Sequence, residues 1–215
     1  KKIILNYLGF KKKLMNIKEI FNSININKGD KILVNSSILK ILIECKKIDK
    51  KFNPNQIIDT IVDKIGKTGT LLLPTYNWDF CRGLRFDYFN SKSQSGSLGN
   101  ISLKRKDFKR SKNPIYSFSI FGNNKDHICK MPHDSCFGLE SPFGYLIKNK
   151  GKNLFIDIDY KDAFTFVHVA EEFIGVDYRY LKDFKGNYKN ELNQETEGHY
   201  KMYVRDLKKV RSTII

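Results

Sequence analysis

Short apolar runs recur along the chain, and turn-forming residues bound each of them. Such runs at residues 31–35, 70–74 and 153–158 predict strands buried on both faces, because a strand with one solvated face alternates apolar and polar side chains. Residues 115–121 do alternate in this way, and residues 200–205 favour one more strand. The pattern therefore predicts a sheet assembled from segments spread over most of the chain.

Apolar residues at helical spacing lie between these runs. The spacing predicts helices at residues 17–24, from residue 38 onward, at 54–65 and at 141–149. Asn53 is a suitable N-cap for the third of these helices, and Pro54 fits its first position. A last helix is expected to end near residue 174, and Asp162 or Thr165 is its expected N-cap.

Strands interleaved with helices in this manner are typical of an α/β protein whose sheet is covered on both faces. No internal repeat, low-complexity tract or linker divides the sequence, so residues 1–215 are expected to form a single domain. Residues 75–110 follow no regular pattern and are rich in aromatic, Ser and Gly residues. A long loop of this kind in a compact domain is usually functional.

Composition narrows the class of protein. No apolar run approaches the roughly 18–20 residues that span a bilayer, and the start of the chain has no convincing signal peptide. Four widely spaced cysteines without a CxxC motif favour a reducing cytoplasm. The 215 residues include 39 Lys or Arg and 23 Asp or Glu, giving a net charge of +16. This charge is consistent with an anionic partner. It is also consistent with a Lys-rich composition that has no functional meaning, since the lysines are scattered through every segment.

Candidate chemistry is concentrated around His168, which follows the last predicted buried strand. Within the first turns of a helix, exposed N–H groups create a positive field that disfavours imidazolium and lowers the histidine pKa. A neutral imidazole suits a general base. Glu171 lies three residues on, on the same helix face, where its carboxylate could orient the ring. The alternative is a histidine that only bonds a backbone carbonyl near the core.

Two further groups of residues could bind a ligand. Ser36 and Ser37 join a strand to a helix, where backbone N–H groups bind phosphate, although paired serines are also ordinary N-caps. The second group offers metal-ligand side chains, but its spacing fits no common zinc site and no metal is expected. It consists of His127, Cys129, His133 and Cys136.

Other enzyme classes lack their motifs. Without a Walker A or Rossmann glycine loop, an NTPase or a dehydrogenase is disfavoured. The sequence also has no GxSxG elbow, as an α/β-hydrolase would need. Thiol chemistry by Cys129 beside His127 is conceivable from the sequence, but nothing else supports it.

Several segments, in order, resemble motifs of one known family. GDKILVNSS (residues 29–37) is similar to a family segment of the pattern Gly-Asp…Val-His-Ser-Ser, and GTLLLPT (residues 69–75) to the strand Gly-Thr-Leu-Leu-Met-Pro-Thr. Further similar segments are FD and the Ser-rich stretch after it (86–98), NPIYS (113–117), GxxSPF (138–143), TxxHxAE (165–171) and KDFxG (182–186). Residues 17–180 therefore resemble the aminoglycoside 3-N-acetyltransferases, which are unrelated in fold to the GNAT enzymes.

The resemblance implies a three-layer α/β/α fold with a central mixed sheet. It also implies an acyl-CoA-dependent N-acyltransferase, with acetyl-CoA or another acyl-CoA as co-substrate and no metal. His168 corresponds to the catalytic histidine of the family, and Glu171 is a secondary catalytic candidate. The residues implied around CoA are Ser36, Ser37, Thr75, Gly96, Leu98 and Ser117. Those expected near the acceptor are Tyr76, Asp87 and Tyr116.

Family chains usually continue beyond the end of this one, so the C-terminal part of the domain is expected to be missing. The carboxylate that orients His168 is then either Glu171 or a residue of that missing part. The family also suggests a homodimer. No nucleic-acid partner and no membrane insertion are expected.

The net charge bears on the acceptor. A protein at +16 repels a polycationic aminoglycoside over long range. We therefore expect the amine of an amino sugar as acceptor, most simply a nucleotide-linked sugar for surface-polysaccharide synthesis. Acetylation of an aminoglycoside, which confers antibiotic resistance, is the alternative reading. A basic nucleic-acid-binding module is the second alternative, since it explains the charge but not the ordered motifs.

Overall fold

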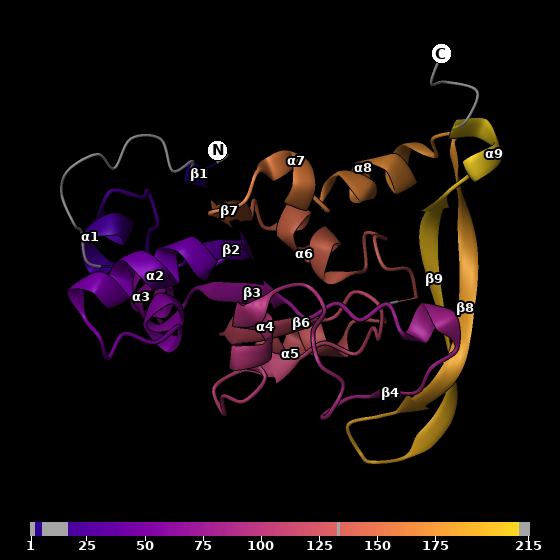
Figure 1. The fold of residues 1–215 in the computed structure, drawn as a ribbon. Helices are drawn as coiled ribbons and strands as arrows, with labels where there is room; N and C mark the ends of the chain where they lie inside the picture. The colour runs from indigo at the N-terminus through magenta and orange to yellow at the C-terminus, as the bar shows by residue number, and fades with distance from the viewer. Residues whose placement is uncertain (1–2, 6–16, 133, 211–215) are drawn as a thin grey trace.

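The computed structural model describes residues 3–5, 17–132 and 134–210. At its centre is a six-stranded sheet with the order β1-β7-β2-β3-β6-β5 (Figure 1). Its strands are β1 (Ile3–Leu5), β2 (Lys31–Ser36), β3 (Thr70–Pro74), β5 (Lys109–Arg110), β6 (Phe118–Gly122) and β7 (Lys152–Ile156). Strands β1, β7, β2 and β3 are parallel to one another, whereas β6 is antiparallel to both β3 and β5. The predicted mixed α/β sheet is confirmed.

Alternate residues of the central strands enter two different hydrophobic cores. Leu71 and Leu73 of β3 face one core, while Leu72 between them faces the other. Because successive side chains of a strand point to opposite faces, this division requires a helical layer on each side of the sheet. The three-layer architecture that the sequence predicts follows from it.

The first core lies under four helices. The strands predicted at residues 31–35 and 70–74 are present as β2 and β3. These helices are α1 (Ile17–Asn22), α2 (Leu39–Ile48), α3 (Asn55–Ile65) and α4 (Ser97–Ser102). The α3 start agrees with the sequence: Asn53 Oδ1 accepts a hydrogen bond from the Asn55 N–H at 3.0 Å, and Gln56 Oε1 accepts one from the Asn53 N–H at 2.9 Å. This reciprocal pair is a capping box, which stabilises the helix by satisfying N–H groups left free at its start.

The second core lies under α5 (Lys125–Lys130), α6 (Pro142–Lys148) and α8 (Val167–Ile174). The single helix expected to follow β7 is instead two short ones, α7 (Tyr160–Ala163) and α8. The predicted N-caps were wrong: Asp159 caps α7 by accepting from the Lys161 N–H, and α8 has no side-chain cap. The break lets Phe164 pack on Phe155 and Phe166 on Phe143, with ring centroids 6.1 and 5.8 Å apart.

A long hairpin stands at one end of the molecule, on the right of Figure 1. It consists of β8 (Arg179–Lys189) and β9 (Glu195–Arg205), with β4 (Phe86–Asp87) along β8 and α9 (Leu207–Val210) after β9. The strand expected at residues 200–205 is the second half of β9, whereas β8 was not predicted.

The short helix η1 (Phe80–Arg82) fixes this hairpin to the rest of the protein. Gly186 and Gly198 are paired across the two strands, and the Phe80 ring packs against both. A Cβ added to Gly186 would lie 3.0 Å from that ring, so only glycine leaves the space that Phe80 occupies. Phe80 is 1% exposed because its ring is enclosed against these two strands. It therefore joins the loop after β3 to the hairpin.

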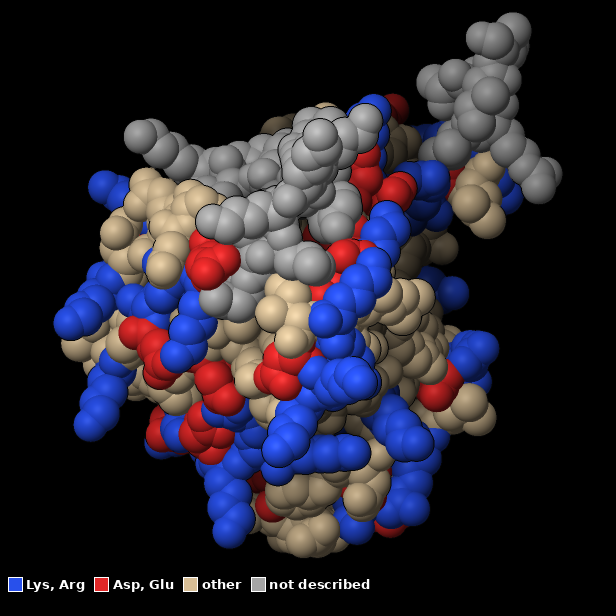
Figure 2. Space-filling view, turned by 60° about the vertical axis from the view of Figure 1, so that its left-hand side comes forward, with Lys and Arg blue, Asp and Glu red and all other residues tan. Residues whose placement is uncertain are grey.

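Lys and Arg side chains project over the face in Figure 2, with Asp and Glu among them. This distribution agrees with charge scattered through the sequence rather than gathered in one block. No helix among the described residues is long and apolar enough to cross a membrane.

Candidate active site

The sheet brings several predicted residues to one edge. Strands β2, β3 and β7 are parallel and end at Ser36, Pro74 and Ile156, so their carboxyl ends share that edge. Strand β6 runs the other way and starts opposite the end of β3, which adds the residues just before it. The Ser37 N–H donates to the Ile156 carbonyl at 2.9 Å. In open α/β sheets, ligands bind outside the carboxyl ends of the strands.

Gly96 and Leu98 reach the same edge through α4. A Cβ on Gly99 would lie 2.1 Å from the Pro74 carbonyl oxygen, so α4 rests directly against the end of β3. Gly96 precedes the helix with a φ of +103°, and a Cβ there would lie 3.3 Å from the Ser36 carbonyl oxygen. Ser37 and Gly96 are exposed, whereas Leu98 packs into the first core. Of the six residues predicted around CoA, Ser37 and Gly96 thus form the accessible part of the edge.

Thr75 and Ser117 meet at this edge but are fully buried, at 0% exposure. Their hydroxyl oxygens are 2.9 Å apart, and the Ser117 hydroxyl donates to the Thr75 carbonyl at 2.7 Å. Arg110 closes the network: its Nε donates to Ser117 Oγ at 3.1 Å and its Nη2 to the Thr75 carbonyl at 3.0 Å. Burial lowers the pKa of this arginine to about 10. The polar atoms of both residues are therefore occupied within the protein.

His168 is the second residue of α8, and its ring lies beside Glu171 as the spacing predicts. The Nδ1 atom is 2.5 Å from Glu171 Oε2. Because a carboxylate only accepts, Nδ1 carries the proton of a neutral ring and Nε2 keeps its lone pair. The His168 side chain is 25% exposed and that of Glu171 14%, so the pair is accessible but partly desolvated.

Opposing influences act on the pKa of His168, and the net shift is downward. Burial is the largest cause and lowers the pKa; the charge of Arg179 and, more weakly, that of Arg205 lower it further. The hydrogen bond and the charge of Glu171 raise it but do not outweigh them. A ring with a pKa below 6.5 is neutral at physiological pH, as a general base requires.

Tyr178 and Arg179 also contact Glu171, and sequence reasoning missed both. The Tyr178 hydroxyl donates to Glu171 Oε1 at 2.9 Å, and Arg179 Nε lies 2.9 Å from Glu171 Oε2. The two residues lie at the start of β8, a strand that no apolar pattern marks. The sequence offered one indication of them: a Tyr-Arg pair in a polar segment, seven and eight residues after Glu171.

A series of aromatic rings connects the sheet edge to His168. Ring centroids are 4.4 Å apart between Tyr76 and Tyr116, 4.7 Å between Tyr116 and Phe137, and 5.1 Å between Phe137 and His168. Trp78, which sequence reasoning also missed, is 40% exposed and lies 6.5 Å from Tyr116. Burial raises the pKa of Tyr116 to about 12, so its phenol stays neutral. Tyr116 and Tyr76 are thus connected to the dyad through Phe137, and Tyr76 itself is buried, at 4% exposure.

Asp87 is not brought to His168. It pairs with Lys189 at the far end of β8, ten residues from Arg179, which corresponds to roughly 33 Å along a strand. Its Oδ1 accepts from the Phe89 and Asn90 N–H groups at 2.9 and 3.0 Å. Asp87 therefore closes a turn, because an Asp at a loop start bonds its own backbone readily.

Cys129 and Cys136 of the candidate metal group are buried rather than reactive. Cys129 is 1% exposed, and burial raises the pKa of its thiol to about 12. Cys136 Sγ lies 3.6 Å from Asn113 Oδ1. His133 lies outside the described residues; within them, no group of three or more His, Cys, Asp or Glu side chains could hold a metal ion.

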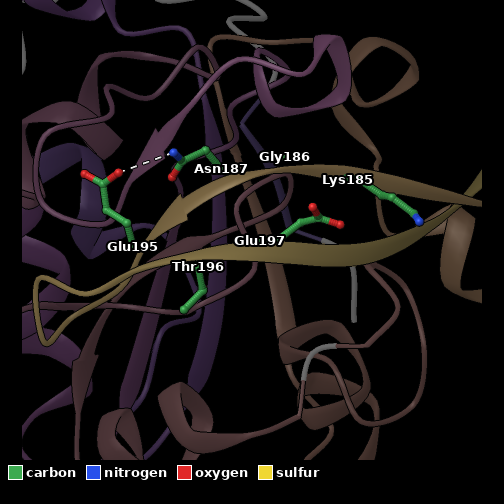
Figure 3. Close-up of a pocket in the computed structure, with 6 residues that line it drawn as sticks. All are labelled: Lys185, Gly186, Asn187, Glu195, Thr196 and Glu197. Carbon is green, nitrogen blue, oxygen red and sulfur yellow. Dashed lines mark hydrogen bonds between the residues drawn. The ribbon is translucent and has the colours of Figure 1, made fainter.

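A cavity of about 510 Å³ opens on the hairpin, where Figure 3 draws its walls. Asn187 Nδ2 and Glu195 Oε2 bond across the two strands at 3.3 Å. The residues that line it are Lys185, Gly186, Asn187, Glu195, Thr196 and Glu197. None of the predicted site residues lines it, so it is separate from the dyad.

The protein combines a mixed α/β sheet with an imidazole–carboxylate pair on α8, an arrangement compatible with a group-transfer enzyme. The sequence profile described as aminoglycoside 3-N-acetyltransferase matches residues 33–213, and the chain belongs to this family. It is thus an acyl-CoA-dependent N-acyltransferase, as the ordered motifs predict.

Individual relatives are distant in sequence. The SPbeta prophage-derived aminoglycoside N(3')-acetyltransferase-like protein YokD of Bacillus subtilis (strain 168) is 24% identical over 195 residues, which cover 79% of this chain and 68% of that protein. The crystal structure of YokD has a TM-score of 0.69 at 22% identity and covers 88% of this chain and 81% of its own.

Structures of two acetyltransferases that carry ligands share the fold. AAC-IIIb, solved as a binary complex with CoASH, has a TM-score of 0.72 at 18% identity, covering 87% of this chain and 74% of that one. AAC-VIa with bound sisomicin has a TM-score of 0.73 at 16% identity and the same coverage. At these identities the likeness establishes the fold.

Proposed function

We propose that this enzyme transfers the acetyl group of acetyl-CoA to an amine of an aminoglycoside, with His168 as general base. The observation that carries the proposal is the His168–Glu171 pair, 2.5 Å apart, in a chain of this family. Relatives of the same fold bind CoASH and sisomicin. This favours the aminoglycoside alternative over the nucleotide-linked amino sugar that the net charge had suggested.

The reaction needs one proton acceptor and one polarised carbonyl. His168 Nε2 takes a proton from the neutral amine as the amine nitrogen attacks the thioester carbonyl and the C–N bond forms. The C–S bond then breaks, and the leaving thiolate of CoA takes this proton from the imidazolium, which restores the neutral base. Glu171 keeps the Nδ1 proton in place and stabilises the imidazolium that forms. Because the Ser117 hydroxyl already donates to Thr75, a backbone N–H is the better donor to the oxyanion than that hydroxyl.

The sheet edge suits the donor substrate. Ser36 and Ser37 supply hydroxyl groups, since the Ser37 N–H is already bonded to the Ile156 carbonyl, and Gly96 leaves open the space that a Cβ would fill. Leu98 holds this loop by packing into the core. Thr75 and Ser117 support the edge from beneath through Arg110, since their own polar atoms are enclosed.

A polycationic acceptor requires carboxylates near the base, and the segment around His168 supplies them. Residues 157–177 contain six acidic side chains and one basic, Lys161, so this segment carries −5 within a chain of +16. Two of the six carboxylates are paired with cations outside the segment, Asp157 with Lys40 and Glu171 with Arg179. The acidic residues are Asp157, Asp159, Asp162, Glu171, Glu172 and Asp177. In the acceptor site that we propose, Tyr116 is the aromatic residue beside the dyad, and the buried Tyr76 supports it from behind, with ring centroids 4.4 Å apart. Asp87 is left out of this site.

The test is thiol release from acetyl-CoA by the purified protein. Acceptors are sisomicin, apramycin and a nucleotide-linked amino sugar. We expect turnover with at least one aminoglycoside and a far lower rate with the nucleotide sugar. His168→Ala should reduce kcat by roughly 10²–10⁴-fold, the usual contribution of a positioned general base.

His199→Ala is the matched control. This histidine is half exposed on the hairpin and also lies between two carboxylates, 3.3 Å from Asp183 and 2.9 Å from Glu197. Its removal should leave kcat within twofold. Preference for the nucleotide sugar would support the nucleotide-linked amino sugar as acceptor and contradict the aminoglycoside proposal. Full activity in His168→Ala would show that His168 is not the general base.

A further inference from the structure

Glu171 is held from two elements at once. On α8, its Oε2 lies 2.5 Å from His168 Nδ1. At the start of β8, Arg179 Nε forms an ion pair with the same oxygen at 2.9 Å, without hydrogen-bond geometry, and the hydroxyl of Tyr178, just before the strand, donates to the other oxygen at 2.9 Å. We infer that Tyr178 and Arg179 form a clamp that positions Glu171, so the β8–β9 hairpin sets the orientation and the proton affinity of His168. This inference rests on the proposed function, in which His168 is the base.

The clamp is itself fixed by the hairpin. Arg179 Nη1 donates to the Tyr203 carbonyl of β9 at 3.0 Å, and the Tyr203 hydroxyl donates to the Val176 carbonyl at 2.7 Å. The Asp206 N–H donates to the Tyr178 carbonyl at 2.8 Å. The Arg179 side chain is only 8% exposed. A guanidinium enclosed in this way has one available position, which restricts Glu171 in turn.

The geometry has an electrostatic consequence. An unclamped Glu171 could turn both oxygens toward His168 and hold it as imidazolium, which cannot accept the proton of the amine. Arg179 competes for the same carboxylate and repels a charged ring. The charged groups acting on His168 are Glu171 on its own helix and Arg179 and Arg205 on the two hairpin strands, and Phe137 covers one side of the ring. Burial lowers its pKa most, and the two arginines lower it further.

The test follows the protonation of His168 directly, by NMR titration of the imidazole signals in the full-length protein. The chain has four histidines, and His168 is assigned by the signal lost in His168→Gln. Arg179→Gln should raise the titration midpoint of His168 by roughly 0.5–1 pH unit, and Arg179→Lys, which keeps the charge, should raise it less. Tyr178→Phe changes an exposed ring and should move the midpoint up by a smaller amount without affecting folding.

Arg205→Gln is the control for charge alone, because Arg205 pairs with Arg179 across the hairpin and its effect on the pKa of His168 is the smaller of the two. It should move the midpoint less than half as far as Arg179→Gln. In acetyl transfer, Arg179→Gln should lower kcat about tenfold or more while KM for acetyl-CoA stays within twofold, since a misplaced base affects the chemical step.

Two results would overturn the clamp: an unmoved midpoint in both Arg179→Gln and Tyr178→Phe, or an equal rise in Arg205→Gln. The titration needs no acceptor. If the wild-type protein acetylates nothing, the proposed function fails while the NMR midpoints still decide whether the hairpin positions Glu171.

Discussion

His168 shows how one residue can be poised by groups that pull its pKa in opposite directions. Burial and two arginines lower that pKa below 6.5, and Glu171 raises it. A base works only when neutral, so kcat/KM should rise with pH to a plateau with a midpoint below 6.5. Glu171→Gln removes the charge that favours imidazolium and should move the midpoint lower still. The measurement is kcat/KM from about pH 5 to pH 8.

The direction of that shift separates the two neighbours of the ring. Arg179→Gln should move the midpoint up and Glu171→Gln down, although each variant weakens the same cluster. His199→Gln, on the exposed face of the hairpin, should leave the midpoint where it is. A midpoint that rises in Glu171→Gln would mean that the carboxylate does not act on His168 through its charge.

At the scale of elements, the hairpin depends on one aromatic side chain. Phe80 is 1% exposed and fills the space left by Gly186 and Gly198. Phe80→Ala should lower the free energy of unfolding by about 3–5 kcal/mol, because it leaves a cavity that paired strands cannot close. Phe89→Ala removes an equal ring that is 56% exposed and should cost about 0.5 kcal/mol or less. Urea denaturation of both variants checks this; equal losses would show that Phe80 is not an anchor.

Elements were predictable where burial alone dictates their sequence. Strand β3 matches its apolar run residue for residue, because a strand buried on both faces must be apolar throughout. Strand β8 was missed since most of its side chains are exposed and its stability comes from β9 and Phe80, which are distant in sequence. The helix after β7 was predicted as one piece because local propensity does not reveal that Phe164 packs on Phe155 and Phe166 on Phe143.

The candidate site divides in the same way. Spacing of three residues on one helix was enough to predict that Glu171 contacts His168. Arg179 could not be found from local pattern, because its contact with Glu171 exists only once the hairpin folds back beside α8. Asp87 was selected by a motif, and the fold carries it to the other end of β8.

At the scale of the whole molecule, the net charge differs in sign from the charge of the segment that contains His168. The value of +16 sums lysines spread over the surface, whereas the segment from 157 to 177 carries −5. A ligand close to that segment responds mainly to the nearby carboxylates, because salt screens exposed charges beyond about 10 Å at 0.1 M. The charge that a bound acceptor experiences is therefore that of the groups within about 10 Å of the base, and not the net charge of the chain.

This contrast predicts the sign of a salt effect. If the acidic segment attracts a polycationic aminoglycoside, kcat/KM for that acceptor should fall several-fold as ionic strength rises from about 0.05 to 0.5 M; if the overall +16 governs the encounter, kcat/KM should rise instead. Asp162→Asn should make the decrease of kcat/KM with ionic strength smaller. Asp63→Asn removes an equal exposed charge from α3, on the opposite face of the sheet, and should leave the slope unchanged. Initial rates at saturating acetyl-CoA show whether the acidic segment or the overall charge governs the encounter. A kcat/KM that rises with ionic strength would contradict attraction by the acidic segment and favour an anionic acceptor.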